Sequence, residues 1–207
     1  FKFSFNTFAN PILEGFYFIR RQPRIGKSLF LLTFAQAIVS TLVVLAPGFA
    51  DKILEIDIED VSLVVMGPSV FGLILGAVLV SSFTRKWLRG TVILMGIITC
   101  GLTLILISLV SPLKQIGIIY PIMFLLSVLG FSNSLINVPS ATVLQEETVS
   151  ELRGRVYGIL TSLTGGFSIL PGLLSGVLAD TIGVDKSLMI VGILVLIFGS
   201  YFTLRRR

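Results

Sequence analysis

The sequence predicts an all-α polytopic membrane protein, a bundle of six transmembrane helices. Six long apolar runs divide the chain of 207 residues, and none of them contains Asp, Glu, Lys or Arg. These runs are 28–50, 61–83, 91–110, 116–138, 156–179 and 187–204. A helix needs about 20 apolar residues to cross the hydrocarbon core of a bilayer. Membrane barrel strands would be about ten residues long with alternating polarity, which these runs do not show, so helices are predicted.

The distribution of charge supports the same fold and orients it. Basic residues gather before the first run, between the second and third, between the fourth and fifth, and after the sixth: Arg20, Arg21, Arg24, Lys27, Arg85, Lys86, Arg89, Arg153, Arg155, Arg205, Arg206 and Arg207. The alternate gaps hold only Lys52, Lys114 and Lys186. Because basic loops remain cytoplasmic, we expect an integral protein of the plasma (inner) membrane with both termini of this segment in the cytoplasm. The net charge of +5 then needs no nucleic-acid partner.

The segment before the first run is predicted to be a cytoplasmic amphipathic linker, residues 1–27, followed by the six-helix bundle at 28–207. Asn10 and Pro11 are typical of a helix start. Apolar residues and then arginines follow, and Pro23 is expected to end that helix. A helix of this kind lies on the membrane surface. It either docks on a preceding domain or anchors the chain at the membrane, and the sequence leaves both open.

The first and fourth runs carry polar residues at helical spacing. Thr33, Gln36 and Ser40 share one face of the first, and Ser127, Gly130, Ser134 and Asn137 share one face of the fourth, with Asn133 beside them. Asparagine in hydrocarbon is costly unless it finds a partner. These faces therefore meet either an aqueous pathway or the polar groups of another helix. The candidate substrate-cavity residues are Gln36, Asn133, Asn137, Ser134 and Thr33.

Glycine and proline interrupt several runs, most densely the fifth. Gly67-Pro68 lies in the second run and Pro121 in the fourth. The fifth has a face of small residues in which Gly172 and Gly176 form a GxxxG pair, which favours close helix contact. Packing or a bendable helix would both produce this pattern. The candidate flexing residues are Gly165, Gly166, Pro171 and Gly172.

Several kinds of chemistry lack their residues in this chain. Cys100 is the one cysteine and histidine is absent, which excludes an intrachain disulfide, a Cys–His pair and histidine-based metal sites. We expect no metal, no cofactor and no enzymatic activity. The apolar runs also lack an ionisable residue, and Asp180 lies just beyond the fifth run. Proton-coupled transporters usually carry such a group inside the membrane.

Motifs that flank the later runs give a more specific indication. They are Asn137-Val138-Pro139, then Gln145, then Arg153-Gly154-Arg155-Val156, then the run from Pro171 through Gly176 to Leu178-Ala179-Asp180. In this order they resemble the C-terminal six-helix half of transporters of the major facilitator superfamily. The branch of bacterial drug and siderophore exporters is most similar. The stretch from Gly76 to Arg85-Lys86 is similar to a second copy of the family's basic loop motif, without its aspartate.

The resemblance implies a rocker-switch transporter in which two six-helix halves open a midplane cavity to each side in turn. The first and fourth helices of a half would line that cavity. Arg153, Arg155 and Arg85 would form a cytoplasmic gate, the first two pairing with Glu146, Glu147 or Glu151. The implied partners are a small amphipathic substrate moved outward, the lipid bilayer and the N-terminal six-helix half of the same protein. Protons would couple transport only through a carboxylate of that other half.

Two alternatives remain open on the sequence. The chain could be a six-span permease that dimerises to build its pathway, or a membrane scaffold or assembly subunit that transports nothing. Substrate, coupling ion and direction are not fixed by these residues.

Overall fold

The structure is a computed structural model that describes residues 21–54, 62–86, 88–111 and 118–204, and these residues are almost all helical, with no strand among them. The main helices are α2 (Pro23–Phe49), α3 (Gly67–Lys86), α4 (Arg89–Val110), α5 (Ile119–Glu147), α6 (Arg153–Ile182) and α7 (Val184–Leu204). A π-helical turn η1 (Ala50–Leu54) continues α2, another, η3 (Ser62–Met66), leads into α3, and a 3₁₀ turn η5 (Ser150–Leu152) precedes α6. The predicted all-α fold is confirmed.

Length and polarity suit these helices to a bilayer. Five helical stretches within the described residues are long and apolar enough to cross a membrane: Pro23–Leu54, Leu63–Val80, Arg89–Val110, Ile119–Glu147 and Ser150–Ile182. The sixth helix is α7, with 21 residues. Six helices therefore stand where six apolar runs were predicted to cross the membrane.

Helix boundaries differ from the predicted runs most at the start of α2 and at the end of α5. Helix α2 begins at Pro23, inside the segment 1–27 that we assigned to the linker, because a proline in the first turn loses no helical hydrogen bond. Residues 1–20 lie outside the described residues, so the linker itself stays a prediction. Helix α5 continues nine residues beyond Val138 to Glu147, so residues expected in a flanking loop are helical. Pro68 and Pro121 lie in the first turns of α3 and α5.

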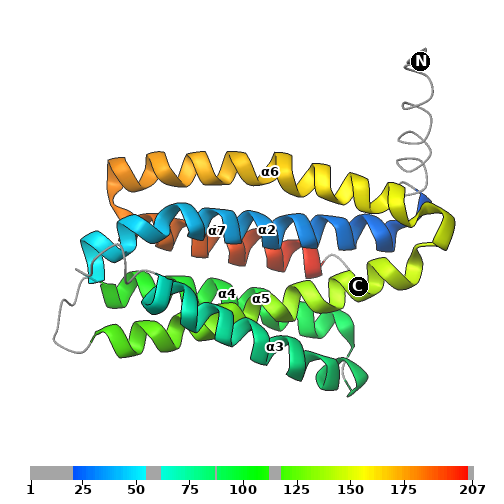
Figure 1. Ribbon diagram of the computed structural model, residues 1–207, viewed down its shortest axis with the longest axis horizontal. Helices are drawn as coiled ribbons and strands as arrows, with labels where there is room; N and C mark the ends of the chain where they lie inside the picture. The colour runs from blue at the N-terminus through cyan, green and yellow to red at the C-terminus, as the bar shows by residue number, and fades with distance from the viewer. Residues whose placement is uncertain (1–20, 55–61, 87, 112–117, 205–207) are drawn as a thin grey trace, which may run out of the picture.

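The helices pack in layers, with α6 and α3 on opposite sides of the bundle (Figure 1). Helix α5 contacts α2, α3 and α4, while α4 also packs along α7. Helix α6 packs chiefly on α2. The arrangement leaves α5 and α2 in the middle of the bundle, which are the helices that carry the two polar faces.

The closest helix contact joins α3 to α5 through glycines. A Cβ atom built on Gly72 would lie 1.8 Å from the backbone oxygen of Ser127, and one on Gly130 would lie 1.9 Å from that of Ser69. The two backbones therefore touch, which only glycine permits. Gly72 and Gly76 form the GxxxG pair at this contact, which the sequence analysis did not single out.

The glycines of α6 are arranged differently. A Cβ atom built on Gly172 would lie 3.3 Å from the Ser40 hydroxyl oxygen, a close contact, and one on Gly176 would lie 3.6 Å from Val44, an ordinary distance. A Cβ on Gly158, Gly165 or Gly166 would meet nothing within 4 Å. Large apolar side chains beside them are exposed: Phe167, Ile169, Leu170, Leu173, Leu174 and Val177. One face of α6 is therefore bare within the described part of the chain.

Candidate substrate cavity

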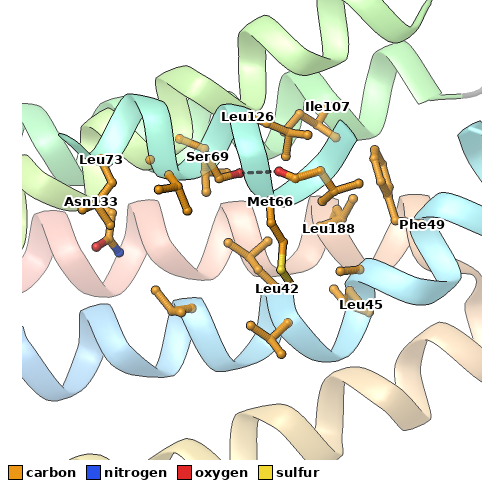
Figure 2. Close-up of a pocket in the computed structure, with 17 residues that line it drawn as sticks. Leu42, Leu45, Phe49, Met66, Ser69, Leu73, Ile107, Leu126, Asn133 and Leu188 are labelled. Carbon is orange, nitrogen blue, oxygen red and sulfur yellow. Dashed lines mark hydrogen bonds between the residues drawn. The ribbon is translucent and has the colours of Figure 1, made fainter. Parts of the chain in front are cut away.

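An apolar pocket of about 240 Å³ lies between α2 and α3. Helices α2 and α3 hardly touch each other, and α4, α5 and α7 close the space behind them (Figure 2). Its lining is almost wholly aliphatic and aromatic: Val39, Leu42, Val43, Leu45, Ala46, Phe49, Val65, Met66, Val70, Leu73, Ile107, Leu126, Leu129 and Leu188, with Ser69, Gly130 and Asn133. Because Val43, Met66 and Val70 are also exposed, the pocket opens between the two helices.

One end of the pocket carries its most polar side chain. Asn133 of α5 is only 6% exposed and lines the pocket. The side-chain nitrogen Nδ2 of Asn137, one turn later, donates hydrogen bonds to the Asn133 side-chain oxygen Oδ1 at 2.6 Å and to its backbone oxygen at 3.3 Å. The structure thus brings together two of the predicted cavity residues, one of them at the pocket wall.

The other predicted cavity residues lie elsewhere. Ser134 donates a hydrogen bond of 2.7 Å to the Leu73 backbone oxygen and so joins α5 to α3. Gln36 is exposed, three residues before Val39 on the pocket-facing side of α2. The Thr33 hydroxyl oxygen is buried and has no hydrogen-bond partner among the described residues.

Most of the pocket wall is apolar and was not predicted, because polar side chains at helical spacing were the signal used for the cavity. A usable signal was present, because helical spacing carries the face of Gln36 onward through Val39, Val43 and Ala46. Those residues line the pocket. A search for the continuation of a polar stripe, rather than for polarity alone, would have found them.

The end of the bundle where α2 and α4 begin and α5 ends carries ion pairs, and we call it the ion-pair end. Arg24 Nη1 lies 2.8 Å from Glu147 Oε1, and Arg89 donates to both carboxylate oxygens of Glu146 at 2.5 and 2.9 Å. Both pairs are solvent-exposed, so each contributes little to stability. They join the start of α2 and the start of α4 to the last turn of α5.

The pairing of the gate arginines with acidic residues stays a prediction, and two of the candidate glutamates pair with other arginines. Glu146 and Glu147 pair with Arg89 and Arg24, because the added turns of α5 carry them toward the starts of α4 and α2. Arg153 instead donates to the backbone oxygens of Thr148 at 3.4 Å and Gln145 at 3.5 Å, where α5 ends. Arg155 lies in the first turn of α6, and the side chain of Arg85 lies outside the described residues. The gate itself stays a prediction.

The predicted flexing residues all lie in α6. Gly165 and Gly166 face open space, Pro171 interrupts the helix interior, and Gly172 lies beside the hydroxyl of Ser40. That hydroxyl donates a hydrogen bond of 2.9 Å to the Ser168 backbone oxygen, one turn before the Gly172 contact. Helix α6 is therefore held to α2 near its proline, and its bending there stays a prediction.

The family is decided by comparison with known proteins. The model of the Major Facilitator Superfamily matches residues 4–172 of this chain. The chain belongs to this family. The resemblance found in the motifs is therefore confirmed, and membership indicates an integral membrane transporter rather than an enzyme.

A curated relative points to the exporter branch of the Major Facilitator Superfamily. The multidrug efflux pump Tap of Mycolicibacterium fortuitum is 30% identical over 136 residues, which are 66% of this chain and 32% of the relative. The matched part is thus about a third of that pump. This agrees with the drug-exporter-like branch that the motifs indicated.

Proposed function

We propose that this chain forms the C-terminal half of a twelve-helix exporter that moves small amphipathic molecules outward across the plasma (inner) membrane by alternating access. The observation that carries the proposal is the apolar pocket with a buried asparagine at one end, in a chain of the Major Facilitator Superfamily. An apolar wall with few polar groups is the usual form of a small-molecule site. The similarity to a multidrug efflux pump supports the outward direction.

The size of the pocket supports a shared site. Pockets that hold drug-sized molecules usually have volumes of about 300–1,000 Å³, larger than the 240 Å³ observed. The pocket is also open between α2 and α3. A facing half would complete the wall, and its bulk would lie against the bare face of α6 and the exposed side of α3.

The pocket offers no ionisable group for coupling. Among the described residues, those that line it are apolar or neutral. If protons drive export, their carrier belongs to the other half. Apolar transfer from water would supply most of the affinity of this half for cargo, at about 25 cal/mol per Å² buried.

The test is export by the full-length protein in proteoliposomes, with a panel of amphipathic dyes and with or without a pH gradient. Val43→Trp would fill the mouth of the pocket without displacing a buried side chain. We expect it to lower dye export at least about tenfold, a loss of about 1.4 kcal/mol of binding free energy, because the indole would occupy the space that the dye needs. If the export rate of every dye is the same with and without the pH gradient, transport is not coupled to protons.

The matched control is Leu106→Trp, on an exposed position of α4 away from the pocket. Its export should equal that of the wild type, and both variants should unfold at similar temperatures in detergent. If Val43→Trp exports the dyes as well as Leu106→Trp does, the pocket is not part of the transport pathway. No export of any dye by the wild type would favour a scaffold role instead.

A further inference from the structure

The pair of asparagines on α5 fixes which atoms of Asn133 accept and which can donate. The nitrogen of Asn137 lies within hydrogen-bond distance of two oxygens of Asn133, one on the backbone and one on the side chain. A backbone carbonyl only accepts, so the Asn137 atom beside it must be the amide nitrogen. The side-chain atom of Asn133 that this nitrogen meets at 2.6 Å must then be the carbonyl oxygen.

The amide nitrogen of Asn133 is left with its donors free. Among the described residues none accepts a hydrogen bond from it. Asn133 is only 6% exposed and forms part of the pocket wall. Figure 2 shows the nitrogen of Asn133 on the side nearer to Met66 and Leu42, and its oxygen on the far side.

We infer that Asn137 holds Asn133 as a hydrogen-bond donor toward the pocket, and that the pocket prefers cargo with an uncharged acceptor, such as a carbonyl or ether oxygen, on an apolar body. This inference rests on the proposed export function and adds a substrate class to it. Asn133 is the residue that would contact the cargo. Asn137 acts through Asn133 and is a positioning residue.

The preference follows from the cost of a buried donor. Cargo without an acceptor would cover the amide nitrogen of Asn133 and leave it without a partner, whereas cargo with an acceptor would satisfy it. The apolar remainder of the wall binds both kinds of cargo equally. The net contribution of one hydrogen bond between uncharged groups corresponds to about a two- to tenfold difference in affinity.

The experiment compares two amphipathic dyes that are identical except that one has a carbonyl group where the other has a methylene. Each competes with a third, fluorescent dye for export by the full-length protein in proteoliposomes. We expect the carbonyl dye to inhibit at about two- to tenfold lower concentration. With Asn133→Leu, that ratio should fall to about one because only the carbonyl dye loses affinity.

The positioning role has a readout of its own. Asn137→Asp changes one atom, and its ionised carboxylate can accept but not donate. It would therefore draw the nitrogen of Asn133 toward itself and turn the oxygen of Asn133 to the pocket. We expect the carbonyl preference to disappear and a dye with a hydroxyl at the same place to become the better inhibitor. At a pH low enough to protonate the introduced carboxyl, that group can donate a hydrogen bond again. The carbonyl preference should then return.

The outcomes distinguish a failure of this inference from a failure of the proposed export function. If the wild type does not export the fluorescent dye, the proposed function fails. If it exports that dye but both competitors inhibit equally, export stands and the acceptor preference is wrong. A ratio that survives Asn137→Asp at high pH would overturn the positioning role, and this variant remains informative even if Asn133→Leu fails to fold.

Discussion

At the scale of single residues, most serine and threonine hydroxyls that form hydrogen bonds in the described helices donate to a backbone oxygen of their own helix. Ser127 donates to the Met123 backbone oxygen and Thr142 to that of Val138, each one turn earlier. Such local bonds are common for serine and threonine in helices. Polar residues at helical spacing therefore do not by themselves indicate an aqueous pathway, because many of them bond to their own helix. Asn133 differs because its side-chain amide nitrogen has no hydrogen-bond acceptor among the described residues.

Thr33 provides a residue-scale prediction, because its buried hydroxyl oxygen has no partner among the described residues. Thr33→Val keeps the shape and removes that oxygen, so we expect the free energy of unfolding to rise by up to about 1 kcal/mol. Thermal unfolding of the full-length protein in detergent measures this. A clear loss of stability would mean that a part of the protein outside the described residues supplies a partner for the hydroxyl.

At the scale of elements, α5 organises the bundle. Its glycine contacts the backbone of α3, its asparagines flank the pocket, and its last turn pairs with the starts of α2 and α4. The same helix thus sets both the pocket wall and the ion-pair end. A change in its tilt would move both together.

Gly130 gives the prediction for this element. A methyl group there would strike the Ser69 backbone oxygen, which cannot move without parting α3 from α5. We expect Gly130→Ala to destabilise the protein by about 1–3 kcal/mol, the usual cost of overpacking. Chemical or thermal unfolding in detergent measures it.

The control for that substitution is Gly154→Ala, because a methyl group at Gly154 meets nothing within 4 Å. Alanine also suits a helix better than glycine, by about 1 kcal/mol. Its stability should equal or exceed that of the wild type. Equal losses for the two variants would contradict the close approach of α3 and α5.

The helices could be predicted from the sequence, since runs of about 20 uncharged residues have few other structural solutions. The long end of α5 could not, because Pro139 and the glutamates after it look like the end of a span. Nor could the α3–α5 contact be predicted, because Gly72 looks no different in sequence from Gly165, which faces open space. The partner of each glycine depends on tertiary packing, and so does the amide orientation of Asn133.

At the scale of the whole molecule, α6 is the least packed of the membrane-length helices in the described part of the chain. Helix α4 packs along both α5 and α7 and exposes one outer face that includes Leu102 and Leu106, whereas α6 packs chiefly on α2 and less on α7 (Figure 1). Exposed apolar side chains by themselves are compatible with lipid, which covers such surfaces in a membrane. Glycines on a bare face suit another helix better, because they let backbones approach closely. This asymmetry supports a second half packed beside α6.

The asymmetry predicts that a bulky residue on the bare face is harmful only where the second half covers it. In the full-length protein we expect Gly165→Trp to lower dye export at least about tenfold, because overpacking at a helix contact separates the helices. Leu106→Trp on α4 serves again as the control and should export normally. Normal export by Gly165→Trp would place lipid, not protein, against this face.

The ends of α6 have a mechanical consequence. Gly183, with φ of +96°, is the single residue between α6 and α7, and Arg153 ties the other end to the carbonyls that finish α5. Neither end can slide along the membrane normal without dragging a neighbouring helix. Pro171 lies between these anchored ends and has no N–H to bond the preceding turn. We therefore expect any independent motion of α6 to be a sideways bow about its middle rather than a displacement along its own axis.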